Sequence, residues 1–487
     1  MFASLFPQTL KPMNVLIIAT NRSAFPAPVM PIGACMVAEA ADRAGHTVRV
    51  LDLMFASDPL RAIESELRKA SCDIIGLSVR NIDNNDMREP AFYIADLLPL
   101  VKAIRRLTSA PIILGGASLM VMPEEILRAA SASCAVLNDG EVVFPLVLQK
   151  FSSGEALGNL PGIAYFENGV FRKNISASTG FSGEFMVPRY HRWIDVGSYS
   201  SRLAAVPLQT KLGCQFQCTY CTYRKIEGSA YRLSDPQQVA NAVELLASSG
   251  LRDIEFVDSV FNAPYDHAMA ICEALARIQL PVRFQSMDVN PLFVDDELFS
   301  VMEHAGFAGI GMTVESASDQ VLRGLKKGFT SRHVHAAAET VRRRRLPCLW
   351  IFMLGGPGET EETVKETLRF AETQIRQQDA AFFTIGIRIY PGTELETTAR
   401  KQGVLSASTA DMLSPVFYVS PDVDGAWIEQ QVKASLKRNM NFMSAISLNV
   451  PYFPLIHRFG YWLGFRTPLW RYTRSIRRGL RLIGMDG

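Results

Sequence analysis

The sequence predicts an α/β protein made of two successive series of alternating strands and helices, followed by a small, mostly helical C-terminal region. Short apolar runs bounded by turn-forming residues alternate with longer helical patterns, which predicts βαβ units around parallel sheets. The 487 residues also exceed the usual size of one domain, so two or three domains are expected. The predicted segments are 1–150 for the first α/β domain, 151–205 for a linker with a hairpin, 206–400 for the second α/β domain and 401–487 for the C-terminal region.

The first series contains five predicted strands, at 13–20, 47–53, 71–79, 110–118 and 133–141. Ligands of such Rossmann-like sheets bind beyond the carboxyl ends of the strands. The candidate ligand-binding residues are therefore those that follow the strands: Thr20, Asn21, Arg22, Ser78 to Asp83, Gly115, Gly116, Ser118, Asp139, Gly140 and Glu141. The linker contains a predicted hairpin at 160–174 that turns at Asn168-Gly169.

The second series contains six predicted strands separated by helical patterns. The strands are 206–213, 253–259, 282–290, 309–316, 348–356 and 382–390. Pro236 stands at the first position of the helix that precedes the second strand, which is a favourable helix start. Six βα repeats predict a partial (β/α)6 barrel, open on one side, with its active face at the carboxyl ends of the strands.

Charge and cysteine content restrict the class of protein. Lys and Arg number 50 against 48 Asp and Glu, so no overall charge predicts nucleic-acid binding. No run of 18 apolar residues predicts a membrane span, and the N-terminus has no secretory signal pattern. Five scattered cysteines are expected to be buried free thiols, which predicts a reducing, cytoplasmic location. They are Cys35, Cys72, Cys134, Cys272 and Cys348.

Three further cysteines, Cys214, Cys218 and Cys221, form a C-x3-C-x2-C motif after the first strand of the second series. A closed zinc site and a four-iron cluster each need four ligands. Three thiolates therefore predict a cluster with one iron left open. The alternatives are a zinc site with a distant fourth ligand and three unrelated thiols.

This motif, with Tyr220 directly before the third cysteine, resembles the signature of the radical S-adenosylmethionine (SAM) enzymes. The resemblance implies a [4Fe-4S] cluster on Cys214, Cys218 and Cys221, which act as metal ligands and catalytic residues. In that family the amino and carboxylate groups of SAM chelate the fourth iron. The family also implies an external electron donor such as flavodoxin or ferredoxin.

Other segments of the second series resemble SAM-binding motifs of the same family. Glu315 and Ser316, in GMTVESAS, resemble residues that contact the ribose of SAM. Gly355, Gly356 and Glu359, in MLGGPGET, resemble the glycine-rich loop against its adenine and methionine ends. For that loop the alternative is a plain strand-to-helix turn capped by Thr360.

Two further segments resemble the cobalamin-binding branch of these enzymes. They are IEFVDSVFN, which contains Asp258, and RIYPGTEL, which begins with Arg388. The Gly-Gly-Glu that often binds the amino group of SAM is absent after the second strand. Asp258 takes either that role or a purely structural one, and Arg388 is assigned to the SAM site.

The first α/β domain resembles the cobalamin-binding domain that precedes the barrel in these enzymes. The resemblance implies a pocket for cobalamin lined by Asn21, Ser78, Arg80, Asn81, Gly115, Gly116, Ser118, Gly140 and Glu141. A response-regulator-like or flavodoxin-like domain shares the same glycine pattern, and only the barrel decides between them.

One departure from the cobalamin-binding pattern bears on mechanism. The loop after the first strand lacks the Asp-x-His-x-x-Gly motif whose His ligates cobalt. The nearby His46 is expected to be a solvated turn residue. Arg80 or Asn81 would then face the cobalt without coordinating it, which favours five-coordinate methylcobalamin and transfer of the methyl group as a radical or a cation.

The last thirty-odd residues are rich in arginine and aromatic residues and nearly lack acidic ones. This composition fits a helical cap packed on the barrel, peripheral contact with the inner face of a membrane, or binding of a partner or nucleic acid. Membrane contact would favour a lipid-like substrate.

These resemblances imply a cobalamin-dependent radical SAM methyltransferase that methylates an unactivated carbon of a small molecule, peptide or lipid. A 5′-deoxyadenosyl radical would abstract hydrogen and methylcobalamin would deliver the methyl group. The alternatives are a rearrangement or cyclisation without methyl transfer, a methylase that makes no adenosyl radical, and a zinc-containing binding protein.

Overall fold

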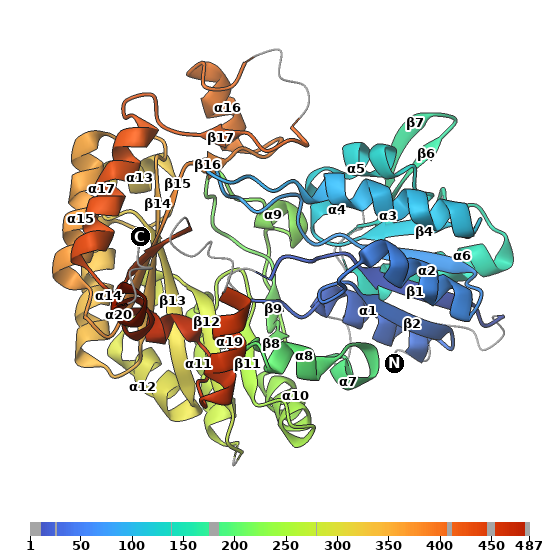
Figure 1. Ribbon diagram of the computed structural model, residues 1–487, viewed down its shortest axis with the longest axis horizontal. Coiled ribbons are helices and arrows are strands. Elements are labelled where there is room, and N and C mark those ends of the chain that lie inside the picture. The colour runs from blue at the N-terminus through green and yellow to red at the C-terminus, as the bar shows by residue number, and fades with distance from the viewer. Residues whose placement is uncertain are drawn as a thin grey trace. The chain divides into compact units, whose positions relative to one another are not determined.

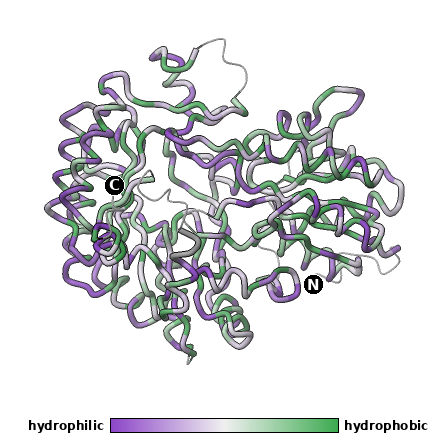
Figure 2. The backbone as a smooth tube through the Cα atoms, in the orientation of Figure 1, coloured by the Kyte–Doolittle hydropathy of each residue, from purple (hydrophilic) through white to green (hydrophobic). Residues whose placement is uncertain are grey.

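The computed structural model describes residues 11–24, 27–137, 139–174, 185–278, 280–406, 412–445 and 453–482, with side chains from 457 onward in the last range. The chain divides into two compact units. The first contains the residues up to Asn84, Ala91–Ser200 and Lys225–Glu227, and the second contains Asn85–Pro90, Ser201–Arg224 and the residues from Gly228 onward. Each unit has its own hydrophobic sheet, as Figure 2 shows by its green central strands.

The first unit is built on a seven-stranded sheet in the order β2-β1-β3-β4-β5-β6-β7. The first five strands are parallel, and β6 pairs antiparallel with both β5 and β7. The strands are β1 (Asn14–Ala19), β2 (Thr47–Asp52), β3 (Ile74–Ser78), β4 (Ile112–Gly115), β5 (Cys134–Val136), β6 (Ile163–Glu167) and β7 (Val170–Asn174). The five predicted strands are present. The predicted hairpin forms as β6 and β7, and it continues this sheet instead of standing apart in a linker.

Helices cover the first sheet, with α1 packed beside α6 and α2 beside α3. They are α1 (Ile32–Arg43), α2 (Pro59–Lys69), α3 (Tyr93–Leu107), α4 (Ser118–Val121), α5 (Pro123–Ala130), α6 (Gly140–Ser153), α7 (Tyr190–Trp193) and α8 (Val196–Ser200). Buried Glu39 of α1 accepts hydrogen bonds from Arg189 and from the Trp193 indole (3.0 Å), which attaches the connecting segment to this unit. The carboxyl ends of β1, β3 and β4 lie together at one edge, as the parallel register requires.

The second unit is built on a parallel sheet in the order β18-β15-β14-β13-β12-β11-β8 (Figure 1). Its strands are β8 (Val206–Leu208), β11 (Asp253–Phe256), β12 (Arg283–Val289), β13 (Phe307–Glu315), β14 (Cys348–Leu354), β15 (Ala380–Ile385) and β18 (Phe442–Ser444). The six predicted strands are present. The seventh, β18, comes from the C-terminal region, where no strand was predicted because three residues carry too short a pattern.

Two short ribbons flank this sheet. β9 (Lys211–Leu212) pairs with β10 (Arg232–Leu233), and β16 (Ile387–Arg388) pairs with β17 (Phe417–Tyr418). The predicted strand 382–390 is therefore interrupted at Gly386, whose φ of +76° ends β15.

Figure 1 shows α15 and α17 along the outer side of the barrel sheet. The helix α9 (Tyr223–Ile226) begins in the second unit and ends in the first. The other helices of the second unit are α10 (Pro236–Ser248), α11 (Tyr265–Ala276), α12 (Asp296–Ala305), α13 (Asp319–Gly324), α14 (Ser331–Arg343), α15 (Glu361–Gln374), α16 (Glu394–Lys401), α17 (Gly425–Arg438), α19 (Phe453–Trp462) and α20 (Thr473–Leu482), with the 3-10 helices η2 (Pro291–Phe293) and η3 (Leu469–Tyr472). Pro236 stands at the first position of α10, as predicted, and Asp235 caps the helix. No helix among these described residues is both long and apolar enough to cross a membrane.

Candidate active site: the cysteine loop and the barrel mouth

The three motif cysteines lie on one loop, residues 213–231, held at its base by the β9–β10 ribbon. The loop starts at Gly213, whose φ is +94° and where an added Cβ would stand 2.1 Å from the carbonyl oxygen of Ala230. Only glycine fits such a close approach of two backbones. The next residue, Cys214, is buried and donates its amide to the Gly228 carbonyl (3.1 Å), so the loop is closed on itself.

The surroundings of Cys218 and Cys221 disfavour the thiolate form of these side chains. Burial raises the pKa of Cys221 to about 12 and raises that of Cys218 as well. Neighbouring thiols raise both values further, and the nearby Lys327 lowers them. Metal ligation requires thiolates, so binding of iron at this loop would be coupled to proton release.

None of the eight cysteines is in a disulfide, so the three motif thiols remain available as ligands. Among the described residues no three His, Cys, Asp or Glu side chains are placed to hold one metal ion. A four-iron cluster differs from a single-ion site, because each cysteine binds a separate iron atom and the ligands do not converge on one ion. The donor set of this loop, three thiols and no histidine, fits such a cluster.

A buried group of three polar side chains stands beside the cysteine loop. Tyr220 donates its hydroxyl to Glu315 Oε1 (2.8 Å), and Lys327 Nζ lies 2.9 Å from the same oxygen. The second carboxylate oxygen, Oε2, is buried and has no hydrogen-bond partner among the described residues. A buried acceptor without a partner is costly, so this oxygen is suited to a donor on a bound molecule.

The backbone of Glu315 explains why its side chain projects at the carboxyl end of β13. Its φ is +57°, in the left-handed region that non-glycine residues rarely adopt, and the register with β14 shifts at this point. Burial by itself would lower the pKa of Lys327, but Glu315 and the thiols of Cys218 and Cys221 raise it above its usual value. Lys327 therefore stays cationic between the carboxylate and the thiols.

The glycine-rich loop is braced from inside by Glu359. This residue is fully buried, and its carboxylate accepts hydrogen bonds from the Gly355 amide (3.2 Å) and the Thr363 hydroxyl (2.7 Å). Burial raises the pKa of Glu359 to about 7, against the lowering effect of these bonds. Gly355 has a φ of +93°, and Thr360 caps α15, as predicted for a turn. Through this hydrogen bond, Glu359 holds the backbone of Gly355 from the buried side of the loop.

The end of α13 connects the glycine-rich loop to the cysteine loop. A Cβ added at Gly324 would lie 2.1 Å from the carbonyl oxygen of Pro357. The next residue, Leu325, accepts the amide of Thr219 at 3.1 Å through its own carbonyl. One turn of chain therefore contacts both loops.

Three other candidates for the SAM site are engaged inside the protein. Asp258 accepts hydrogen bonds from the Thr210 amide (2.7 Å) and hydroxyl (2.6 Å), and it pairs with buried Lys211 (3.3 Å). Ser316 is fully buried and shares a hydrogen bond with Thr367 (3.0 Å). These contacts favour the structural role for Asp258, which joins the ends of β8 and β11.

Arg388 is the third of these candidates, and it lies in β16, past the bend that ends β15. Its guanidinium donates to the backbone carbonyls of Ile389 and Met412, the latter at 2.7 Å, and stacks on the Tyr390 ring. Its contacts hold the polypeptide around it, and its assignment to SAM stays a prediction.

Sequence reasoning missed Lys327 and Lys211, two buried lysines of this region. Both are at most 7% exposed, and each neutralises a carboxylate that the sequence did identify. A lysine in GLKKGFT or QTKLG carries no spacing signal, because burial of a cation depends on a partner distant in sequence. The available signal for these lysines was that the sequence analysis had identified Asp258 and Glu315 without a basic partner.

In the first unit, the cobalamin candidates gather after β1, β3 and β4. The side-chain nitrogen of Asn21 is buried without a partner, and a Cβ added at Gly115 would meet nothing within 4 Å. Gly116 has a φ of +109° and leaves only 2.3 Å between such a Cβ and the Val79 carbonyl oxygen. An unsatisfied amide and an uncrowded glycine at the same edge of the sheet fit a polar ligand there.

The remaining cobalamin candidates divide by exposure. Ser118 is buried and donates to the Val79 carbonyl (2.6 Å), so it holds the loop instead of facing a ligand. Ser78, Asn81, Gly140 and Glu141 are half-buried and Arg80 is exposed, as a ligand-binding edge requires. Their contacts with cobalamin stay predictions.

His46 corrects one expectation. It is 5% exposed, not solvated, and its Nδ1 accepts the Met13 amide (3.3 Å) at the start of the sheet. Burial lowers its pKa, so the ring is neutral. The expectation failed because a histidine after Gly45 matches a turn pattern, while its burial depends on Met13. The five scattered cysteines, in contrast, are free, and all but half-buried Cys72 are buried, as predicted.

Comparison with known families identifies both units. Residues 20–148 match the B12 binding domain, and residues 209–371 match the radical SAM superfamily. The match to the second begins just before the cysteine loop and extends through the glycine-rich loop into α15.

Relatives and solved structures match most of this chain. The chain is 25% identical to an uncharacterized methyltransferase of Pyrococcus horikoshii over 75% of this chain and 77% of that protein. It is 21% identical to the tryptophan 2-C-methyltransferase of Streptomyces laurentii, over 77% and 73%. The structure of the radical SAM methyltransferase TsrM from Kitasatospora setae, with cobalamin and a [4Fe-4S] cluster bound, has a TM-score of 0.85 at 21% identity and covers 98% of this chain and 100% of its own.

A second solved fold agrees. The cobalamin-dependent SAM radical enzyme OxsB has a TM-score of 0.70 at 17% identity, covering 98% of this chain and 76% of its own. The predicted fold class is confirmed, and the resemblance that the cysteine motif suggested is confirmed with it. The chain therefore combines a B12 binding domain with a domain of the radical SAM superfamily that follows it.

Proposed function

We propose that this protein is a C-methyltransferase that uses SAM, cobalamin and a [4Fe-4S] cluster to methylate a carbon of a small-molecule or lipid substrate. One observation carries the proposal. The three thiols and the partnerless Glu315 oxygen lie together at the carboxyl end of a barrel, in a chain that also has a B12-binding domain. When bound, these cofactors would supply an electron for cleavage of SAM and a carrier for the methyl group.

The residues of the second unit would bind and orient SAM. Cys214, Cys218 and Cys221 would hold the cluster on three irons and leave the fourth for SAM. Glu315 would accept a hydrogen bond from a SAM hydroxyl through Oε2, while Tyr220 and Lys327 fix its other oxygen. Because Lys327 is cationic, it also offsets the negative charge of the thiolates.

The residues of the first unit would bind cobalamin at the carboxyl edge of its sheet. Asn21 would donate from its partnerless amide, and Gly115 would let the polypeptide approach the ligand closely. His46, the described histidine nearest in sequence to these residues, accepts the Met13 amide just before the start of β1, at the other end of the strand from the carboxyl edge, so it would not reach a ligand there.

The class of substrate is proposed from the relatives. The printed names of similar proteins include a tryptophan 2-C-methyltransferase and, at 23% identity over 61% of this chain, the hopanoid C-3 methylase of Methylococcus capsulatus. These are an amino acid and a lipid, so the shared feature is transfer to carbon, not one substrate. We also propose a cytoplasmic location and an external one-electron donor such as flavodoxin or ferredoxin.

Anaerobic reconstitution tests the proposal in two steps. The protein should bind about four irons and four sulfides per chain, and it should bind cobalamin. With reductant and SAM, a product that gains one CH2 unit from methyl-labelled SAM supports methyl transfer. A product of unchanged mass would instead support rearrangement or cyclisation, and bound zinc without sulfide would contradict the whole scheme.

A further inference from the structure

The C-terminal segment 457–482 combines a strong positive charge with exposed aromatic residues. It contains seven arginines and no lysine, aspartate or glutamate. At the end of α19, four consecutive or nearly consecutive apolar side chains are exposed: Phe459 (60%), Tyr461 (43%), Trp462 (76%) and Leu463 (52%). Single exposed apolar residues are ordinary, but a contiguous group of this size indicates a contact surface. We call these four residues the aromatic tip.

The aromatic tip is presented from a firmly attached base. Trp470 packs against buried Leu349, Ala380 and Met443 at the amino ends of the barrel strands. A Cβ added at Gly309 would lie 2.8 Å from the Trp470 ring, so glycine is needed there. The segment is therefore anchored to the second unit by packing, and its exposed face is held in place.

A buried arginine completes this attachment. Arg477 is 8% exposed and donates to the carbonyls of Leu436 (3.2 Å), Asn439 (3.1 Å) and Phe442 (2.8 Å). It is the arginine of α20 that points inward. The five exposed arginines of the segment are Arg458, Arg466, Arg471, Arg478 and Arg481.

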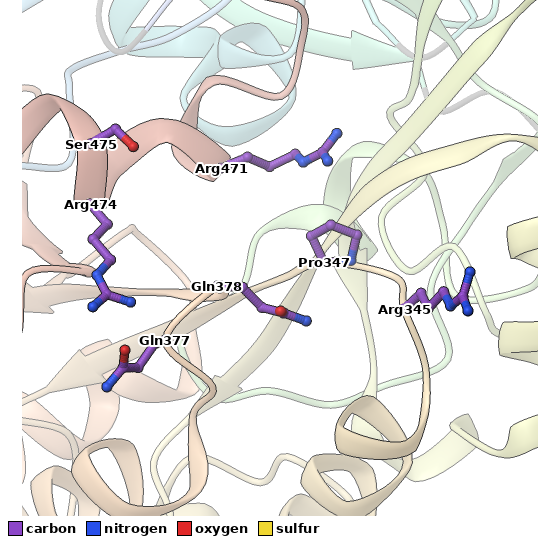
Figure 3. A pocket seen from close by; sticks show the side chains of 7 residues that line it. All are labelled: Arg345, Pro347, Gln377, Gln378, Arg471, Arg474 and Ser475. Atoms are coloured by element: carbon purple, nitrogen blue, oxygen red, sulfur yellow. The ribbon is translucent and has the colours of Figure 1, made fainter.

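A basic pocket lies next to this base. It has a volume of about 530 Å³ and is lined by Arg345, Pro347, Gln377, Gln378, Arg471, Arg474 and Ser475. Figure 3 shows Arg471 and Arg474 on one side and Arg345 beyond Pro347 on the other. Among the described residues, no carboxylate pairs with any of these three guanidinium groups. Three arginines with amide and hydroxyl donors favour a phosphate ester, which arginine binds through paired hydrogen bonds.

The apolar part of the surface distinguishes a lipid from a nucleic acid. Phe459 and Trp462 pack on each other with ring centres 5.8 Å apart, and Leu463 extends the same patch. Nucleic-acid surfaces present separate aromatic platforms on which bases stack, and leucine offers none. A tryptophan and its apolar neighbours beside arginines are instead typical of a segment that lies in a membrane interface.

We propose that segment 457–482 docks the protein onto an anionic phospholipid surface, with the aromatic tip inserted and the arginine pocket occupied by a lipid phosphate. The charge complementarity is direct, because all charged side chains of the segment are arginines and the leaflet carries negative headgroups. The contact is peripheral. It lies on an element packed at the amino ends of the barrel strands, whereas the cysteine loop follows their carboxyl ends, so docking leaves the cofactor-binding face uncovered by this segment.

Sedimentation of the cofactor-loaded full-length protein with vesicles tests this proposal. We expect binding to phosphatidylcholine vesicles that contain one-third phosphatidylglycerol, and little binding to pure phosphatidylcholine. Raising the salt from about 0.1 M to about 1 M should weaken the binding, because it shortens the range of charge attraction severalfold. Absence of binding to the anionic vesicles would overturn the proposal.

Two double variants separate the apolar and the charged contributions. Phe459→Ser with Trp462→Ser should lower the vesicle partition coefficient by about tenfold or more. Arg471→Gln with Arg474→Gln should lower it by roughly 30-fold, which corresponds to about 1 kcal/mol for each arginine near the surface.

Matched controls carry the same chemical changes elsewhere. Leu245→Ser removes an apolar residue that is 63% exposed on α10, and Arg61→Gln with Arg68→Gln removes two exposed arginines on α2. Both should bind vesicles like the parent protein. Equal losses in controls and test variants would overturn the proposal. Tighter binding to oligouridine than to vesicles, lost in the same test variants, would assign the surface to nucleic acid and also overturn it.

Cleavage of SAM in vesicle-free solution keeps this test separate from the proposed function. It should be the same in all these variants, since none of them changes the barrel mouth. Loss of methyl transfer with normal vesicle binding would contradict the proposed function and leave the docking surface intact.

Discussion

The two units present their candidate ligand-binding edges in different ways. The edge of the first sheet is made of glycines, half-buried polar residues and one partnerless amide on Asn21. The mouth of the barrel instead holds buried charges, with Glu315 and Lys327 paired beside three thiols. The edge of the first sheet offers a shaped surface with a few hydrogen-bond donors. The mouth of the barrel offers the electrostatic field of buried charges that are poorly solvated.

This difference predicts where single substitutions should have large effects on ligand binding and stability. A binding edge that relies on shape spreads its affinity over many weak contacts, so each residue contributes little. A site with buried charges concentrates its energy in a few groups, because an unpaired charge there is strongly destabilising. We therefore expect large effects at the barrel mouth and small ones at the first sheet.

The largest effect is expected for Cys218→Ala. Loss of one of three cluster ligands should abolish reductive cleavage of SAM, because the cluster would no longer assemble with one open iron. Cobalamin binding should remain, since that site belongs to the other unit. The control is Cys272→Ala in α11, a fully buried thiol outside the loop, which should leave SAM cleavage intact. Normal cleavage in C218A would refute the proposed mechanism.

Glu315→Gln should be next in size. It leaves Lys327 buried without a charged partner, which should lower the free energy of unfolding by about 3–5 kcal/mol, and it should weaken SAM binding. Chemical denaturation and SAM titration measure the two effects. The double variant Glu315→Leu with Lys327→Met should recover much of the stability but not SAM affinity. Recovery of both would mean that Glu315 only balances charge.

Glu359→Gln should change how stability depends on pH. The pKa of Glu359 is raised to about 7 in the folded protein, above its usual 4.5, so the protonated form is the one that folding favours. Its stabilising contribution is complete below about pH 4.5 and is lost as the pH rises through about 7. Between these limits the parent protein should lose about 3 kcal/mol relative to the variant. Parallel stability curves across this range would contradict the assignment.

The smallest effect is expected in the first unit, for Asn21→Ala. Removal of one hydrogen-bond donor, worth about 1 kcal/mol, should weaken cobalamin binding roughly fivefold and leave SAM cleavage unchanged. Ser118→Ala should instead lower the stability of this unit with little change in cobalamin affinity, because Ser118 bonds the Val79 carbonyl. A larger loss of cobalamin affinity in S118A than in N21A would reverse this part of the comparison.

Features that depend on residues close together in sequence could be predicted, and features that depend on residues far apart in sequence could not. Strands and helices of both series could be predicted because periodic patterns are local, and the cysteine motif could be assigned because its three ligands lie within eight residues. Glu315 was identified because its segment, at the end of a predicted strand, resembles a SAM-binding motif. Its cation Lys327, the buried state of His46 and the pairing of β18 with β15 depend on partners far away in sequence, and no local pattern signals them.

The contact of α13 with two loops has a consequence for motion at the barrel mouth. Gly324 touches Pro357 of the glycine-rich loop, and Leu325 bonds Thr219 of the cysteine loop. Because one short turn fixes both, neither loop can fluctuate independently, and restraint of one lowers the conformational entropy that remains to be lost by the other. Filling the iron–sulfur loop should therefore make the second loop more rigid before any SAM arrives, which slower amide hydrogen exchange at Gly355 and Gly356 would reveal.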